Sequence, residues 1–297
     1  MIIENMVPRK VEKCSNIIFN TVTVYNALSK LKPTFSVGPD GLCAYFIKKL
    51  KNVLCIPLST IFEVSYRTSK LPVLWSEALV VPVYKKNNPY SVENYRPISL
   101  CCVTCKLMES IIDSQILKHL SSNNIISEKQ HGFSRGKSCQ TQLLQCKTSW
   151  LSIMDKKEFF DIVYIDFSKA FDSVVHNKLI LKLRNVGIDG FLLSWISAFL
   201  KGRTQRVKIN TSCSNPLNVN SGVPQGSVLG PTLFNIFIND LVEQILYSEI
   251  YLFADDVKIF SKNSVQLQHD LKAFIEWANK WQLEISFDKC CVLHLGN

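Results

Sequence analysis

The stretch that decides the fold of this chain is residues 251–260, which read Tyr251-Leu252-Phe253-Ala254-Asp255-Asp256-Val257-Lys258-Ile259-Phe260. Segments rich in β-branched and aromatic residues flank the two aspartates, and such segments are typical of strands. The short polar break between them predicts a hairpin that turns at the aspartates. Adjacent carboxylates at the tip of an apolar hairpin are costly unless a positive group meets them, because unpaired buried charge is heavily penalised.

A separate carboxylate, Asp166, ends the predicted strand 162–166. An aspartate at a strand end and an Asp-Asp hairpin together provide what two-metal phosphoryl transfer requires. Mg²⁺ is a hard cation that proteins hold with one or two carboxylates plus substrate phosphates, so Asp166 and Asp255 are predicted metal ligands. Asp256 is a second-carboxylate candidate, either near the metal or hydrogen-bonded behind it, and the backbone carbonyl of Phe167 is a further candidate ligand. The alternative is that Asp255-Asp256 is an ordinary polar turn.

Composition sets broad limits on the class of protein. The 297 residues are 47% hydrophobic, so the chain can bury a sizeable core as one large domain or two small ones. A net charge of +10 favours a polyanionic partner, of which nucleic acid is the first candidate. No apolar run approaches the ~20 residues that span a bilayer, and no secretory signal is visible, so we expect a nuclear or cytoplasmic protein without a membrane partner. The 11 cysteines are therefore expected to be reduced, and their spacing does not favour a zinc site.

Hydrophobic periodicity predicts helices mixed with short strands and no strict βαβ alternation. This pattern predicts an α+β fold, with an antiparallel sheet that carries helices on one face. The predicted helices are 15–31, 42–50, 56–68, 106–120, 138–155, 177–186, 191–200, 232–246 and 265–281. The predicted strands are 78–83, 96–100, 162–166, 205–209, 218–223, the two arms of the hairpin, and a last pair that brackets Asp288 and Lys289.

Several motifs together resemble those of reverse transcriptases. VYIDFSKAFD at 163–172 and GVPQGSVLGP at 222–231 resemble the first and second palm motifs, and Phe253-Ala254-Asp255-Asp256 resembles the third. NYRPISL at 94–100, QHGF at 130–133 and GRTQRV at 202–207 resemble motifs of LINE-type (non-LTR) retrotransposon enzymes, in the same order. From about residue 31 to its end, the chain is similar to the reverse transcriptases of the Jockey-like group.

The resemblance implies a right-hand polymerase fold with fingers and palm. It divides the chain into an N-terminal helical extension at 1–60, a fingers-rich region at 61–160 and a palm-rich region at 161–297 that ends at the primer grip. It also implies RNA-templated addition of deoxynucleoside triphosphates to the 3′-hydroxyl of a DNA primer. The implied cofactor is a pair of Mg²⁺ ions, with Mn²⁺ as the alternative.

The resemblance also assigns roles to side chains that bind the nucleotide. An aromatic residue at Phe171 crowds the sugar 2′ position and excludes ribonucleotides. Gln225 and Gly226 form the loop that contacts the incoming nucleotide and the template. Arg96 grips the triphosphate, since a guanidinium suits phosphate oxygens.

Further basic residues are candidates around this site. Lys85 or Lys86 supplies a second positive charge near the triphosphate, and Lys289 matches a palm lysine that acts as general acid toward pyrophosphate. Arg135 and Lys137 are expected to contact template phosphate. No nucleophile with a third partner accompanies His131, which is therefore expected to be structural.

Three alternatives stay open. A noncatalytic palm scaffold that binds nucleic acid predicts a broken set of carboxylates, whereas Asp166, Asp255 and Asp256 are all present. An RNA-templated RNA polymerase is disfavoured by Ala254 and Phe171, and a group II intron-type reverse transcriptase shares much of the pattern.

Because the chain stops at Asn297, within the segment that resembles the primer grip, we expect a truncated copy without thumb or endonuclease. The sequence does not indicate an oligomeric state.

Overall fold

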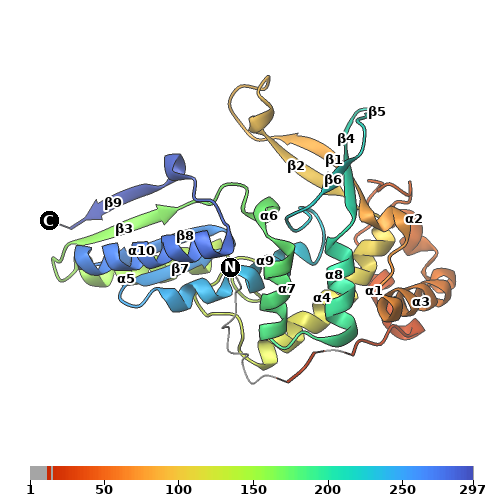
Figure 1. Cartoon of the computed structure of the whole chain (residues 1–297), viewed down its shortest axis with the longest axis horizontal. Coiled ribbons are helices and arrows are strands. Elements are labelled where there is room, and N and C mark those ends of the chain that lie inside the picture. The colour runs from red at the N-terminus through yellow and green to blue at the C-terminus, as the bar shows by residue number, and fades with distance from the viewer. Residues whose placement is uncertain (1–11, 15, 297) are drawn as a thin grey trace. The chain divides into compact units, whose positions relative to one another are not determined.

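The computed structural model describes residues 12–14 and 16–296 of the chain, which folds into two compact units that are each discontinuous in sequence (Figure 1). Unit 1 contains the described residues up to Asn123 together with Ile180–Gly230. Unit 2 contains Asn124–Leu179 and the described residues from Pro231 onward. The functional ranges predicted from the sequence are continuous and have other boundaries, and their assignment stays a prediction.

Unit 1 combines a helical layer with a mixed sheet. Strand β1 pairs antiparallel with β2 and parallel with β4, and β4 pairs antiparallel with both β5 and β6. Helix α3 packs against α1 and α8, and the indole N–H of Trp195 donates to the Ser65 hydroxyl at 3.1 Å within this buried layer. The elements are α1 (Thr21–Lys30), α2 (Ala44–Lys49), α3 (Lys51–Thr68), β1 (Glu77–Tyr84), β2 (Tyr95–Leu100), α4 (Val103–Ser122), α8 (Gly190–Leu200), β4 (Arg203–Ile209), β5 (Ser212–Cys213) and β6 (Leu217–Val219).

Unit 2 is built on an antiparallel sheet, as the sequence predicts, and its strand order is β7-β8-β3-β9. Its elements are α5 (Cys139–Met154), β3 (Phe160–Ile165), α6 (Ala170–Ser173), α9 (Gly230–Ile238), β7 (Glu249–Phe253), β8 (Asp256–Ser261), α10 (Ser264–Trp281) and β9 (Cys291–Leu295). Helix α7 (His176–Asn185) begins in unit 2 and ends in unit 1, because the division falls after Leu179, and the first residue of α9, Gly230, is the last of unit 1.

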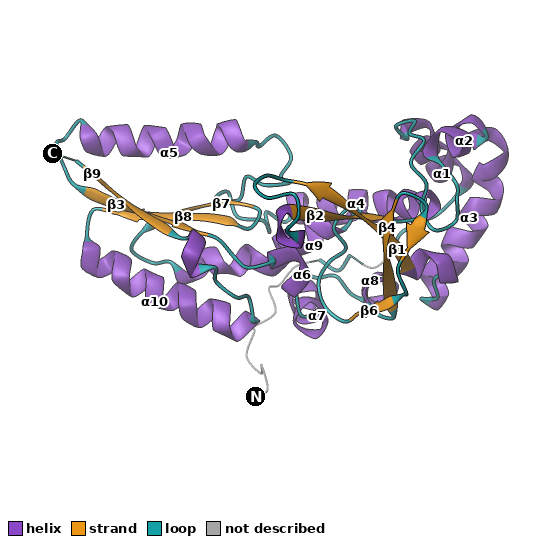
Figure 2. Cartoon of the chain, turned by 90° about the horizontal axis from the view of Figure 1, so that it is seen from above, coloured by secondary structure: helices purple, strands orange, loops and turns teal. Residues whose placement is uncertain are grey.

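The prediction that helices cover only one face of the sheet is wrong. Figure 2 shows α5 on one face and α10 on the other. Phe160, Ile162 and Phe260 pack with Cys146 and Trp150 of α5. The residues that alternate with these along β3 and β8 are also buried, namely Val163, Ile165, Val257 and Ile259, so both faces of these strands are covered.

Several element boundaries also differ from the prediction. Helix α1 begins at Thr21 because the Asn20 side chain caps it, accepting from the Thr23 N–H at 2.8 Å. The predicted helix 232–246 is α9 followed by a 3₁₀ helix at Asn239–Gln244. Strand β9 follows Asp288 and Lys289 but pairs with β3, so no hairpin forms there. Residues 1–11 and 15 of the predicted N-terminal extension lie outside the described residues.

The part of the chain that the structure describes includes no helix that is both long and apolar enough to cross a membrane.

Candidate active site

The β7–β8 hairpin presents the two adjacent carboxylates at the end of the sheet of unit 2. Phe253 pairs with Asp256 across the hairpin, so Ala254 and Asp255 form its two-residue turn. Ala254 has φ = 56°, a left-handed conformation that alanine rarely adopts. Asp255 is half-buried, whereas Asp256 at the start of β8 is exposed. The predicted hairpin is confirmed, and it places both carboxylates at one edge of the unit.

Asp166 comes directly after β3, beside this hairpin. Ile165 pairs with Val257, and one further step of the same antiparallel register brings Asp166 opposite Asp256. Directly opposite residues of an antiparallel pair lie on one face of the sheet with their Cβ atoms about 4.5–5.5 Å apart. The three aspartates that the sequence singles out therefore come together.

Electrostatics show that the carboxylates influence one another. Partial burial raises the pKa of Asp255, and the neighbouring charges of Asp256 and Asp166 raise it further. Desolvation by neighbouring atoms, followed by the charge of Asp166, raises the pKa of Asp256. The Lys289 ammonium lies 3.3 Å from a carboxylate oxygen of Asp166 and partly offsets the rise in the pKa of Asp255. The cluster is thus short of positive charge.

This donor set fits a divalent cation that completes its shell with substrate oxygens. Among the described residues, no three or more His, Cys, Asp and Glu side chains are grouped so that they could hold a metal ion. Mg²⁺ does not require such a group, because it is usually bound by one or two carboxylates plus phosphates and water.

The hydrogen bonds of its neighbours determine which way the backbone carbonyl of Phe167 points, which the sequence alone does not show. The Asp166 carbonyl accepts from the Ser286 N–H at 2.9 Å, and the Ser168 N–H donates to the Glu284 carbonyl at 2.8 Å. Both groups therefore point away from β8. Since successive carbonyls of extended chain alternate in direction, the Phe167 carbonyl points to the side of the Asp-Asp hairpin.

Phe171 lies in α6, in contact with two other aromatic rings of unit 2. Its ring stacks on Phe234 with centroids 4.4 Å apart, and the ring of Phe133 meets it edge-on at 6.2 Å. Phe171 is only half-buried, so part of the ring remains accessible while its orientation is fixed.

Gln225 and Gly226 belong to unit 1, where they lie against β2. The Gln225 carbonyl accepts from the Ser99 N–H at 2.9 Å. Gly226 has φ = 105°, and a Cβ there would lie 2.6 Å from the Ser99 carbonyl oxygen, so only glycine fits. The loop is thereby held close to the strand that carries Arg96.

Arg96 and Lys85 are exposed on the β1–β2 hairpin of unit 1. Arg96 pairs with Val83, and the Lys85 N–H donates to the Asn94 carbonyl at 2.8 Å, which continues the same register. Residues two apart in a strand point to the same face, so both side chains lie on one face of this hairpin. Lys86 follows in the exposed loop.

The two basic residues expected at template phosphate differ in environment. Arg135 is exposed in the loop before α5. The Lys137 ammonium is engaged within unit 2, because it donates to the Glu128 backbone carbonyl at 2.7 Å and forms an ion pair with the Glu128 carboxylate at 3.0 Å.

The QHGF motif contains site residues whose role the sequence did not reveal. The buried Gln130 side chain hydrogen-bonds the Ala254 N–H at 2.9 Å, which ties it to the turn of the hairpin. His131 is buried and hydrogen-bonds Thr141 at 2.9 Å and Gln145 at 3.0 Å, as expected for a structural histidine. The sequence neighbours of Gln130, Lys129 and His131, are polar, so only the resemblance of the QHGF motif to that of LINE-type enzymes pointed to this segment.

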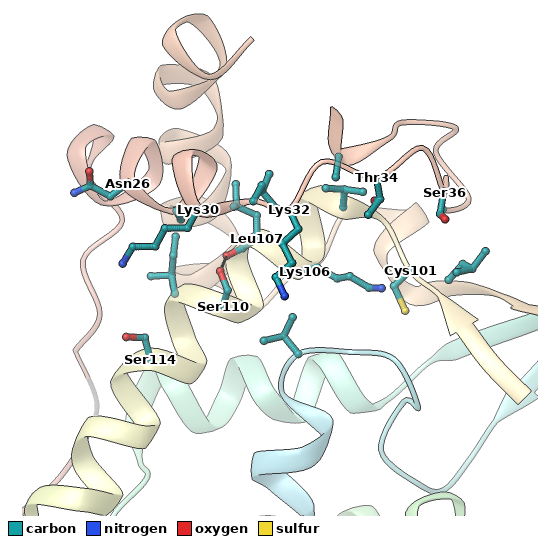
Figure 3. A pocket seen from close by; sticks show the side chains of 18 of the residues that line it. Asn26, Lys30, Lys32, Thr34, Ser36, Cys101, Lys106, Leu107, Ser110 and Ser114 are labelled. Atoms are coloured by element: carbon teal, nitrogen blue, oxygen red, sulfur yellow. Dashed lines mark hydrogen bonds between the residues drawn. The ribbon is translucent and has the colours of Figure 1, made fainter. Parts of the chain in front are cut away.

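Unit 1 contains a pocket of about 790 Å³ that the sequence did not predict. Figure 3 shows Lys30, Lys32 and Lys106 around it, with Ser110 and Thr34 among the other lining residues. The lining also includes many apolar side chains, such as Leu31, Leu107 and Ile111, so the three lysines add positive charge at an otherwise largely apolar hollow.

Comparisons with known proteins agree with these features. Residues 83–295 match the family described as reverse transcriptase (RNA-dependent DNA polymerase). The chain is 32% identical over 288 residues to the RNA-directed DNA polymerase from mobile element jockey of Drosophila funebris, and 30% identical over 280 residues to the probable RNA-directed DNA polymerase from transposon BS of Drosophila melanogaster. These matches cover 92% and 90% of this chain but 31% of each relative, so the chain spans about a third of their length.

A solved structure supports the fold. Apo telomerase from Candida tropicalis, truncated from its C-terminal domain, matches with a TM-score of 0.56 over 88% of this chain and 58% of that chain, at 12% identity. The similarity to the Jockey-like group and the right-hand polymerase fold are both confirmed. With its palm motifs inside the matched range, the chain belongs to the reverse transcriptase family.

Proposed function

We propose that this chain is the fingers-and-palm part of a non-LTR retrotransposon RNA-directed DNA polymerase. In this proposal unit 2 is the palm and unit 1 contains the fingers. The observation that carries the proposal is the register of β3 and β8, which brings Asp166 opposite Asp256 and next to Asp255. A structural turn would need no third carboxylate from a distant strand.

Asp166 and Asp255 would hold the divalent cations, with Asp256 and the carbonyl of Phe167 as additional donors. Two bound Mg²⁺ ions, or Mn²⁺ in their place, activate an attacking hydroxyl and stabilise a leaving phosphate oxygen. The raised pKa values of Asp255 and Asp256 support this assignment, since carboxylates that repel one another at a half-buried edge are stabilised when a cation binds.

Lys289 is proposed to give a proton to the departing pyrophosphate. Its ammonium already lies 3.3 Å from Asp166 while its side chain remains 62% exposed, so it is near the reacting groups and free to reorient. Arg96 and Lys85 are proposed to bind the triphosphate, because a guanidinium and an ammonium on one hairpin face can grip several phosphate oxygens.

Phe171 is proposed to exclude ribonucleotides, and its stacking on Phe234 supports a rigid barrier. Gln225 and Gly226 are proposed to contact the nucleotide and template through a loop fixed against β2. Template RNA would meet positive charge at the lysine-lined pocket of unit 1 and at Arg135. Lys137 would contribute only by exchanging its Glu128 partner for a phosphate.

The test is primer extension on poly(rA)·oligo(dT) with Mg²⁺. We expect the wild-type chain to extend the primer and Asp255→Asn to abolish extension, because one ligand charge is lost. Asp155→Asn, at an exposed aspartate after α5, is the matched control and should extend normally. Extension by Asp255→Asn at the wild-type rate would refute the ligand assignment. Equal primer–template binding by both proteins without any extension would favour the noncatalytic scaffold.

A further inference from the structure

The segment that precedes α5 runs along the open edge of β7. The Leu252 N–H donates to the Lys129 carbonyl at 3.0 Å, and the His131 N–H donates to the Leu252 carbonyl at 2.9 Å. Gln130 forms a parallel bridge with Leu252. The segment is therefore attached to the arm of the hairpin that leads into the Asp-Asp turn.

One side-chain oxygen joins this segment to the turn itself. The Gln130 amide oxygen accepts from the Ala254 N–H at 2.9 Å and from the Gly132 N–H at 2.8 Å. Gln130 is 1% exposed, so water cannot replace it. Because Ala254 adopts a left-handed backbone that is unfavourable for alanine, the turn needs surrounding contacts to hold it.

Gly132 allows the close approach that this contact requires. A Cβ at Gly132 would overlap the backbone nitrogen of Ala254 and lie 2.8 Å from the carbonyl carbon of Phe253. The Gly132 carbonyl accepts from the Asn235 side chain of α9 at 2.8 Å. Backbone thus packs directly on backbone, and α9 fixes the position of the segment.

The next residue reaches the other functional element of unit 2. The Phe133 ring lies 6.2 Å from that of Phe171, in an edge-on arrangement, and is 55% exposed. Four consecutive residues therefore contact both the turn that presents Asp255 and the aromatic ring proposed to select the sugar.

We propose that Gln130–Phe133 is a positioning clamp that sets the geometry of the Asp-Asp turn through Gln130 and the orientation of Phe171 through Phe133. The inference rests on the proposed function, which gives these two elements their roles. Neither residue is a catalytic residue, because each acts through a neighbour. A small displacement of reacting groups is costly, since a 1 Å misplacement can lower the rate by about 10²-fold.

The Gln130 amide also donates to the Ala254 carbonyl at 3.4 Å. The test of Gln130 compares Gln130→Met, which keeps the length but removes both the acceptor and the donor, with Gln130→Glu, which keeps an accepting oxygen. The matched control is Gln140→Met, the same change at an exposed glutamine of α5. Each variant is measured by hydrogen exchange of peptides covering 250–257 and by single-nucleotide incorporation with Mg²⁺.

Gln130→Met should speed exchange in 250–257 and lower kcat by up to about 10²-fold, with little change in the KM for the nucleotide. Gln130→Glu should exchange more slowly than Gln130→Met and recover part of kcat, because it keeps the accepting oxygen but loses the amide that donates to the Ala254 carbonyl. Gln140→Met should leave both exchange and kcat unchanged. The proposal is overturned if Gln130→Met matches the wild type, or if Gln130→Glu exchanges as fast as Gln130→Met. If the wild type extends no primer, the proposed function fails for this chain. The hydrogen-exchange rates of 250–257 in the wild type and the Gln130 variants then still show whether the clamp exists.

Phe133 is tested by Phe133→Ala, a change at an exposed side chain that should not prevent folding. It should raise the ratio of ribonucleotide to deoxyribonucleotide incorporation while exchange in 250–257 stays slow. An unchanged ratio would remove Phe133 from the clamp.

Discussion

Asp255→Asn should stabilise the chain in the absence of divalent cations even as it abolishes nucleotide addition. Two like charges about 5 Å apart, the spacing of opposite strand partners, repel by about 1 kcal/mol at the dielectric constant of water. Asp255 is affected by the carboxylates of Asp256 and Asp166 and by the ammonium of Lys289, so the net repulsion corresponds to about one such pair. Its removal should raise Tm by about 2–4 °C.

The sign of the pH dependence follows from the raised pKa of Asp255. Over the range between the ordinary carboxyl pKa and the raised value, the folded chain binds more protons than the unfolded chain, so stability falls as pH rises. The side-chain amide of the Asp255→Asn variant does not titrate. The difference in stability between variant and wild type should therefore be absent in strong acid, appear as the pH rises through this range, and persist at neutral pH.

The assay is thermal unfolding in EDTA from acid to neutral pH, repeated at neutral pH with increasing Mg²⁺. Asp155→Asn is the matched control and should follow the wild type throughout. Mg²⁺ should raise the Tm of the wild type, because a ligand that binds only the folded state stabilises it, and should raise that of Asp255→Asn much less. A lower Tm for Asp255→Asn than for the wild type in EDTA at neutral pH would refute the view that these carboxylates repel one another.

Other variants and conditions test separate parts of the proposal. Phe171→Ala should raise ribonucleotide relative to deoxyribonucleotide incorporation by about 10- to 200-fold, the range that small steric differences provide. Competition primer extension measures this ratio, and an unchanged ratio would contradict the proposed role of Phe171. In Glu109→Ala, the buried Leu229 N–H and the part-buried Val228 N–H lose their acceptor. The change should cost about 1–3 kcal/mol for the buried group and less for the other, and urea unfolding should show a smaller cost for Glu109→Gln. Primer–template affinity should fall steeply with salt, and a flat response in filter binding would contradict a phosphate-binding surface.

The antiparallel sheet of unit 2 and the proximity of its aspartates were predictable from sequence for a physical reason. The hairpin has strongly strand-forming arms and a two-residue polar break, so its local preferences agree with its tertiary position. Asp166 could be recognised as a candidate ligand because it ends another strand of the same kind. Neither strand alone specifies a fold, but the order of the motifs along the chain indicated one.

What the sequence did not reveal depends on contacts between distant segments. The parallel pairing of β1 with β4 joins residues 77–80 to 204–207, and no local pattern encodes such a partner. The second helical layer over the sheet was missed because the prediction rested on the order of helices and strands along the chain, which does not determine the face that each helix covers. The role of Gln130 was missed because a glutamine next to a histidine is, by composition, an ordinary polar loop.

In two places in this chain, a buried side-chain oxygen accepts hydrogen bonds from the backbone N–H groups of a loop that carries, or directly adjoins, proposed site residues. In unit 2, the Gln130 amide oxygen accepts two backbone N–H groups and holds the Asp-Asp turn. In unit 1, the buried Glu109 carboxylate accepts from Val228 at 2.7 Å and Leu229 at 3.1 Å, directly after the Gln225-Gly226 loop. A loop has no ladder to satisfy its N–H groups, so a buried side-chain oxygen must do so if the loop is to keep one conformation. Hence the conformations of both loops depend on side chains, Gln130 and Glu109, that need not contact a substrate. Removing either acceptor should change the positions of the site residues more than the affinity for the substrate.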